Sequence, residues 1–237
     1  MGSGGSIPHP VDKEIEGNVA YLKKLAAEVK SFEGNLTSTF CACQTLLKSC
    51  EGVSRSFVGF AYDGEEALYT VVKDFDTEVR SLKEGAALET LQSEMSDSVK
   101  VALNPLKKQL EKALKVSNSL ACSKKKFDKC AHSIDKAQQK CAKQNRSLTE
   151  NKSYAKLSRD RDSAQTSCET KKQELSEEVN ALRILVKEFI ASGLPGYVSA
   201  TAGFAKDVGT RLEVAAEHSR LQALRGPEHV PGYPTSE

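Results

Sequence analysis

A seven-residue apolar repeat in the middle of the chain constrains the fold more than any other feature. An apolar residue recurs at every seventh position, at Val99, Leu106, Ala113, Leu120, Phe127, Ile134, Cys141 and Leu148. A repeat this long marks the face along which one helix packs on another, because 3.5 residues per turn keep that face on its partner. We therefore expect a coiled-coil helix that ends at about Leu148.

Apolar residues at helical spacing also precede this repeat. They recur at steps of three, four and seven from residue 15 to residue 60, and the turn at residues 62–64 ends the run. A second helical stretch begins near residue 65 and leads into the repeat. We expect Gly85 to loosen it and Pro105 to kink or restart it, because proline donates no hydrogen bond to a helix.

A third helix is predicted after a polar break over residues 146–152. Its apolar positions run from Tyr154 to Phe189, and a weaker pattern continues over residues 198–224. Between them, residues 193–196 (Gly-Leu-Pro-Gly) predict a kink or a break. No segment alternates with a period of two between turn signals, so the predicted fold is all-α.

The break at residues 146–152 is short enough to make the helices on either side antiparallel neighbours that meet at a distal tip. We expect a slender arm there, because its seam residues are small. We expect a thicker centre, shared with a second chain, where bulky apolar residues gather: Phe32, Phe40, Phe57, Phe60, Leu182 and Phe189.

Composition excludes several classes of protein. With 39% apolar and 28% charged residues, the chain is too polar for a compact α/β enzyme and too apolar for a disordered chain. It has no apolar run of about 18 residues, the length that a membrane-spanning helix needs.

Residues 1–10 (MGSGGSIPHP) lack the features of a secretory signal, and we interpret them as a disordered tag remnant. We place the helical domain at residues 11–224 and a Pro/Gly-rich tail or linker at 225–237.

Charge is distributed unevenly along the chain. The net charge is +2, but residues 107–161 carry 16 basic and 5 acidic residues, or +11, which leaves −9 for the rest. With the apolar repeat at heptad position a, eight lysines fall at positions c and g, about 40° apart on the helix surface. These lysines are Lys108, Lys112, Lys115, Lys126, Lys129, Lys136, Lys140 and Lys143.

The same basic character continues across the predicted tip. Arg146 lies at the break, and Lys152, Lys156 and Arg159 follow at a spacing of four and three residues. We predict that these four residues and the eight lysines bind an acidic membrane of the phosphoinositide or phosphatidylserine class. A merely solvated helix face is one alternative. Nucleic acid is another, but no aromatic residues are interleaved with the lysines, since Phe127 belongs to the seam.

No constellation of residues indicates catalysis or a bound cofactor. The chain has no Gly-rich phosphate loop and no GxSxG or HExxH motif, so we predict that it is not an enzyme. A metal site at Cys41, Cys43 and Cys50 is disfavoured, because the first two side chains point about 200° apart on a helix. The seven cysteines are an odd number at mostly apolar positions, which favours a reducing, cytoplasmic compartment. Sequons at Asn35, Asn145 and Asn151 argue weakly against it.

Three long kinked helices in this order resemble a BAR domain. The resemblance covers about residues 15–219, and its best local matches are residues 101–108 (VALNPLKK), residues 123–135 (SKKKFDKCAHSID) and residues 185–190 (LVKEFI). It implies a crescent-shaped homodimer that senses or stabilises curved membranes in trafficking, as a peripheral membrane protein. The amphipathic N-terminal helix of some BAR proteins is not visible here.

Two other functions remain open. One is an elongated scaffold that binds a small GTPase or a cytoskeletal protein without remodelling membranes. The other is a secreted helical surface protein, which would need glycosylated sequons and paired cysteines.

Overall fold

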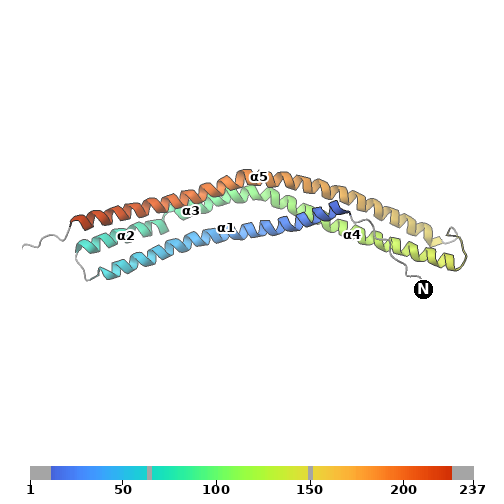
Figure 1. Ribbon diagram of the computed structural model, residues 1–237, viewed down its shortest axis with the longest axis horizontal. Helices are drawn as coiled ribbons and strands as arrows, with labels where there is room; N and C mark the ends of the chain where they lie inside the picture. Colours follow the sequence, from blue (N-terminus) through green and yellow to red (C-terminus); the bar gives the residue numbers. More distant parts are fainter. Residues whose placement is uncertain (1–11, 63–65, 149–151, 226–237) are drawn as a thin grey trace, which may run out of the picture. The chain divides into compact units, whose positions relative to one another are not determined.

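The computed structural model describes residues 12–62, 66–148 and 152–225, and every regular element within these ranges is a helix (Figure 1). The prediction of an all-α fold is confirmed. The elements, in order, are α1 (Lys13–Phe60), α2 (Glu66–Glu84), α3 (Ala86–Glu94), the π-helix η1 (Met95–Lys100), α4 (Val101–Lys143) and α5 (Lys152–Arg225). The predicted tag remnant, most of the tail and most of the turn at residues 62–64 lie outside the described residues.

The chain divides into two compact units, and each long helix contributes to both. Unit 1 comprises residues 1–31 and 103–190, and unit 2 comprises residues 32–102 and 191–237. Two of the boundaries fall within five residues of a proline, Pro105 in α4 and Pro195 in α5.

In unit 1, polar contacts between helices fix the direction of each helix. Residue numbers rise on α4 as they fall on α5 in the pairs Lys112–Glu178, Ser123–Ser167 and Gln138–Tyr154, so these helices are antiparallel, as predicted. Numbers rise together in the pairs Asp12–Lys172 and Asn18–Ser176, so α1 runs parallel to α5.

The predicted seam is the core of α4. Six of its eight members are buried, and Phe127 and Leu148 are half-buried. In unit 1 the seam packs with apolar residues from α1 and α5 that recur at the same helical spacing. The buried residues of those two helices are Ile15, Leu22, Val29, Ala164, Cys168, Leu175, Val179 and Leu182.

The C-terminal end of α4, at the tip, has a recognisable stop signal. Asn145 adopts a left-handed conformation (φ 49°), which asparagine tolerates better than most residues. The Arg146 amide donates to the Cys141 carbonyl and the Asn145 amide to the Ala142 carbonyl, the bonds of a Schellman motif. The helix therefore ends at Lys143, three residues before the predicted break.

Unit 2 has a core to which five elements contribute. Leu47 of α1, Leu82 of α2, Leu91 of α3, Met95 of η1 and three residues of α5 form one buried cluster; the α5 residues are Ala200, Phe204 and Val208. Between α1 and α2, the pairs Ser54–Asp76 and Glu51–Lys83 show an antiparallel hairpin. The interruption expected at Gly85 is confirmed, because that residue separates α2 from α3.

Two expectations need correction. Of the two alternatives expected at residues 193–196, a kink or a break, the break is wrong, because α5 is continuous from Lys152 to Arg225 with Pro195 inside it. The kink or restart expected at Pro105 is also displaced. The helix changes from the π-helix η1 to α4 after Lys100, on the N-terminal side of the proline, and Pro105 itself lies within α4. Both helices tolerate proline because packing compensates for the one backbone hydrogen bond that each proline removes.

The thick centre shared with a second chain stays a prediction, because the structure describes a single chain. Of the six bulky residues, Leu182 and Phe189 lie in unit 1, and Phe32, Phe40, Phe57 and Phe60 lie in unit 2. Phe57 and Phe60, near the end of α1, are 48% and 84% exposed in the single chain. Sequence spacing could not reveal this, because it does not say which part of a long helix has a neighbour.

Candidate functional site: a basic helical arm

The basic residues predicted to bind a membrane lie on the surface of unit 1, on α4, on α5 and in the turn between them. All those whose side chains are described are exposed: Lys108, Lys112, Lys115, Lys126, Lys129, Lys136, Lys140, Lys143, Arg146, Lys156 and Arg159. Lys152 is the first residue of α5, and its side chain lies outside the described part of the chain.

The lysines of α4 are placed by its seam. Because position a packs in the core, positions c and g must point away from it, at about 200° and 240° around the helix. No position c or g from Lys108 to Lys143 holds an acidic residue. Of the eleven predicted basic side chains that the structure describes, ten take part in no ion pair, and Lys112 is the exception. The result is a run of uncompensated positive charge.

Lys112 differs from the other lysines. Its ammonium lies 2.7 Å from a carboxylate oxygen of Glu178, and that carboxylate also accepts a hydrogen bond from the Gln109 side chain. Glu178 therefore offsets the charge of Lys112. The predicted site includes Lys112 together with the other seven lysines of α4, because heptad position alone does not show which residue of the neighbouring helix lies opposite.

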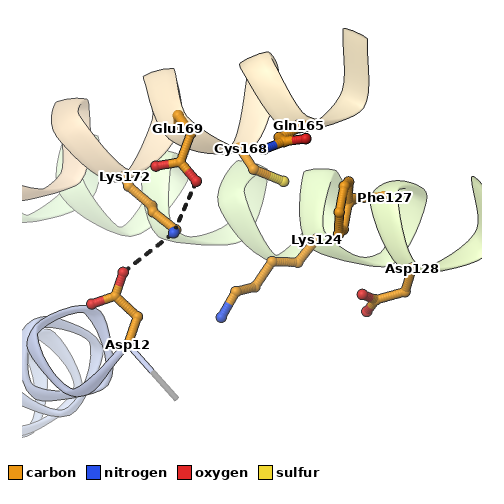
Figure 2. Close-up of a pocket in the computed structure, with 8 residues that line it drawn as sticks. All are labelled: Asp12, Lys124, Phe127, Asp128, Gln165, Cys168, Glu169 and Lys172. Carbon is orange, nitrogen blue, oxygen red and sulfur yellow. Dashed lines mark hydrogen bonds and ion pairs between the residues drawn. The ribbon is translucent and has the colours of Figure 1, made fainter. Parts of the chain in front are cut away.

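We call α4, the start of α5 and the turn between them the basic arm. The start of α1 is anchored beside this arm, at a cavity of about 380 Å³. Figure 2 shows Lys172 of α5 between two carboxylates, Asp12 and Glu169, at 3.3 and 3.1 Å. Asp12 also caps α1, since its carboxylate accepts a hydrogen bond from the Ile15 amide at 3.3 Å. Lys124 and residues 127–128 of α4 line the same cavity.

These contacts shift the acid–base properties of the anchor. The hydrogen bond from the Ile15 amide, together with Lys172, lowers the pKa of Asp12. The hydrogen bond with Glu169, together with Asp12, raises the pKa of Lys172. Burial raises the pKa of the Cys168 thiol, which makes it a poor nucleophile. The cavity carries charges of both signs and a protonated thiol, so it suits an anchor better than a catalytic site.

Sequence reasoning left two exposed lysines of the arm out of the predicted site. Lys124 and Lys125 fall at positions e and f, outside the c and g lines, and the structure exposes both. Their position within the run of residues 124–126 was the available signal. Lys124 belongs to the cavity at the start of α1, on the other side of the seam from position g.

Within residues 12–62, 66–148 and 152–225, no three His, Cys, Asp or Glu side chains are grouped as metal ligands. The seven cysteines form no disulfide, and Cys41 and Cys122 are exposed. In the described part of the chain, no helix has both the length and the apolar character needed to cross a bilayer.

The architecture is an all-α chain of three long helices, and its fold is that of BAR proteins. A solved structure of a BAR protein from Galdieria sulphuraria is similar to this chain with a TM-score of 0.57 and 15% sequence identity. The match covers 92% of this chain and 100% of that one. The resemblance seen in the sequence is thereby confirmed at the level of the fold. No protein-family model and no curated protein matches the chain.

Proposed function

We propose that this chain is a membrane-curvature sensing or stabilising domain, which binds anionic phospholipid membranes as a homodimer through its basic arm. The observation that carries the proposal is the run of exposed lysines on α4 that lack acidic partners, on a fold of the BAR type. A cytoplasmic, peripheral membrane location follows from the proposal.

Electrostatic attraction supplies the binding energy in this account. Each lysine near an acidic leaflet contributes about 1 kcal/mol, and the attraction falls off within about 10 Å at 0.1 M salt. Six of the predicted lysines of α4, from Lys108 to Lys140 and without Lys112, span 33 residues, or about 50 Å at about 1.5 Å per residue. An extended, lightly curved bilayer surface fits a linear site of this length better than a small ligand does.

An exposed apolar stripe supports the homodimer. Leu46, Val53, Phe57 and Phe60 of α1 are spaced by seven, four and three residues, so they lie on one face of the helix. Each is at least 48% exposed in the single chain. Large apolar side chains that line up in this way are costly to leave in water, and a second copy of unit 2 would cover them.

Charge reversal on the arm tests the membrane proposal. The variant Lys136→Glu/Lys140→Glu/Lys143→Glu should lose at least tenfold in affinity for phosphatidylserine vesicles, with unchanged helicity. The matched control is Lys23→Glu/Lys24→Glu/Lys30→Glu, which changes the net charge equally at exposed positions of α1. Equal losses in both variants would show that only net charge matters.

The same experiment separates the runner-up function. If the wild-type protein is a dimer that ignores acidic vesicles, the scaffold for a small GTPase or a cytoskeletal protein becomes the better account. Charge reversal on the arm would then weaken binding to that partner instead.

A further inference from the structure

The exposed apolar stripe of α1 is part of a longer heptad pattern. With Cys43 and Cys50, which are both half-buried, its members follow one another at steps of three, four, three, four and three residues. Such steps keep side chains on one side of a helix. We call this set the α1 seam: Cys43, Leu46, Cys50, Val53, Phe57 and Phe60. The neighbouring residues Leu47 and Ser54 are fully buried within the chain itself, so the α1 seam borders the core of unit 2 without belonging to it.

The outer edge of the α1 seam is lined by small, uncharged residues. Ala42, Ser49 and Ser56 recur every seven residues on the side of the helix that faces away from Leu47, and all three are exposed. Small side chains at such an edge allow a second helix to approach to the ordinary packing distance of about 8–10 Å. No charge would have to leave water for that contact, so a helix fits this face well.

The spacing of the α1 seam identifies the helix that would fit. Its steps have the same order from either end, so the seam matches a second copy of itself that runs antiparallel about a two-fold axis. An axis between residues 51 and 52 places every member opposite another member: Cys43 opposite Phe60, Leu46 opposite Phe57, and Cys50 opposite Val53. Both phenylalanines then face smaller side chains, as facing layers of a well-packed core do.

The neighbouring registers fit less well. Moving the axis half a heptad toward the start of α1 leaves Phe57 and Phe60 without seam residues opposite them, although Phe60 is 84% exposed in the single chain. Moving it half a heptad the other way leaves Cys43 and Leu46 without such residues. Among these three registers, the axis between residues 51 and 52 alone covers the whole seam.

Two exposed apolar residues outside the α1 seam give an independent check. They are Leu68 of α2 and Val198 of α5, which are 57% and 53% exposed, and both belong to unit 2. Ser54 of α1 bonds Asp76 of α2, and these two helices are antiparallel. Counting from this contact, Leu68 lies level with residue 62 of α1.

The position of Val198 follows from the core of unit 2. Leu47 of α1 and Phe204 of α5 belong to one buried cluster, and these two helices run parallel, so Val198 lies level with about residue 41 of α1. Residues 41 and 62 are equally far from an axis between residues 51 and 52. The axis that matches the α1 seam to itself therefore also brings Leu68 of one copy level with Val198 of the other.

We propose that the α1 seam binds the α1 seam of a second copy in antiparallel contact, about a two-fold axis between residues 51 and 52. This inference rests on the proposed function, because it specifies which residues meet in the homodimer.

Disulfide trapping in the full chain tests this pairing, because the α1 seam already contains thiols. The background is Cys41→Ser/Cys122→Ser, which removes the two exposed cysteines. Val53→Cys in this background should crosslink to Cys50 of the other copy on mild oxidation. Arg55→Cys is the matched control, since it is exposed on the same helix but outside the α1 seam. We expect at least about fivefold more covalent dimer from the seam variant than from the control, because disulfides form only between nearby, aligned side chains.

A second variant tests the pairing away from the axis. Phe60→Cys in the same background should crosslink to Cys43 of the other copy, at a concentration at which sedimentation velocity shows the variant to be dimeric. Peptide mapping identifies the linked cysteines, and circular dichroism checks the helicity of each variant. The wild-type chain is measured in parallel for its oligomeric state and for binding to phosphatidylserine vesicles.

The outcomes separate the pairing from the proposed function. Covalent dimers from Val53→Cys and Phe60→Cys, joined to the expected cysteines and scarce in the control, support the pairing. A dimeric chain in which Val53→Cys crosslinks no better than the control would overturn the pairing and leave the proposed function standing. A monomeric wild-type chain would overturn both the pairing and the homodimer of the proposed function, while its vesicle binding would still test the basic arm by itself.

Discussion

At the scale of single residues, a buried polar contact fixes the register of the hairpin formed by α1 and α2. Ser54 is fully buried, and its hydroxyl donates to the Asp76 carboxylate at 2.8 Å. Asp76 is also buried and pairs with Arg80 at 2.7 Å. Removing one partner of a buried polar pair costs more than the bond itself contributes, since the other partner is left without its bond.

We therefore predict that Ser54→Ala lowers the free energy of unfolding by about 1–3 kcal/mol, as measured by urea denaturation. Ser56→Ala is the control, because the Ser56 hydroxyl is exposed and bonds only the Gly52 carbonyl of its own helix. The control should change stability by less than about 0.5 kcal/mol. Equal effects of the two substitutions would contradict the role given to the buried contact.

Asp12 makes the first turn of α1 sensitive to pH. Its pKa is lowered in the folded chain, so its contribution to stability is present above the usual range of aspartate, near about 3.9. That contribution is lost as pH falls through the folded pKa. As pH falls through the folded pKa of Asp12, hydrogen exchange at the Ile15 amide should therefore become faster than the pH dependence of an unprotected amide predicts.

Two substitutions separate the cap from the ion pair at Asp12. Asp12→Ala removes both. At neutral pH it should lower the free energy that protects the first turn from hydrogen exchange by about 1 kcal/mol, which corresponds to about fivefold faster exchange. Asp12→Asn keeps a capping side chain, so it should retain most of the protection and lose the dependence on pH. Similar exchange rates in both variants at neutral pH would show that the cap is unimportant.

At the scale of helices, α5 and η1 approach each other closely in unit 2. A Cβ atom added at Gly196 would lie 2.7 Å from the Cβ of Ser98, well inside van der Waals contact. Gly203, in the same helix, has no atom within 4 Å of the corresponding point. The two glycines therefore respond in opposite ways to the same substitution.

We predict that Gly196→Ala lowers the melting temperature although alanine favours helices, because the clash outweighs the gain in propensity. Gly203→Ala should instead stabilise the chain by about 0.5–1 kcal/mol. Adding Ser98→Gly to Gly196→Ala removes the clashing atom and should restore stability. A stabilising effect of Gly196→Ala alone would show that α5 and η1 separate at no cost.

Helices were predictable from the sequence to the extent that one face of each is buried. The heptad from Leu106 to Cys141 marked the buried face of α4. The polar break at residues 146–152 placed the end of that helix within a few residues of Lys143, where it is observed. At residues 193–196 local propensity predicts a kink or a break, and the break does not occur because packing in unit 2 keeps α5 continuous. The candidate site was predictable by position on α4. The pairing of Lys112 with Glu178 was not, since it depends on the stagger between α4 and α5.

At the scale of the whole molecule, charge and exposed apolar surface are assigned to different units. Unit 1 carries 24 basic and 15 acidic residues, whereas unit 2 carries 10 and 17. The exposed apolar stripe of α1, from Leu46 to Phe60, belongs to unit 2. This separation favours membrane binding by unit 1 and self-association by unit 2.

We predict that Leu46→Glu/Val53→Glu converts the proposed homodimer to a folded monomer, because both side chains are about half exposed in the single chain. Thr45→Glu, at an exposed position beside the stripe, should leave the dimer intact. Sedimentation velocity measures both outcomes. If both the double variant and the control remain dimeric, the interface lies elsewhere. If both dissociate, the added negative charge explains the dissociation without any role for the apolar stripe.

The central claim is electrostatic adhesion of a dimeric scaffold to acidic membranes. Its most direct test is sedimentation of the wild-type protein with vesicles of increasing phosphatidylserine content, at low and high salt, with the oligomeric state measured in parallel. The account predicts a dimer that pellets only with acidic vesicles and is released by salt, because the contact is made by exposed lysines. A monomer that stays in the supernatant with acidic vesicles at low salt would contradict it.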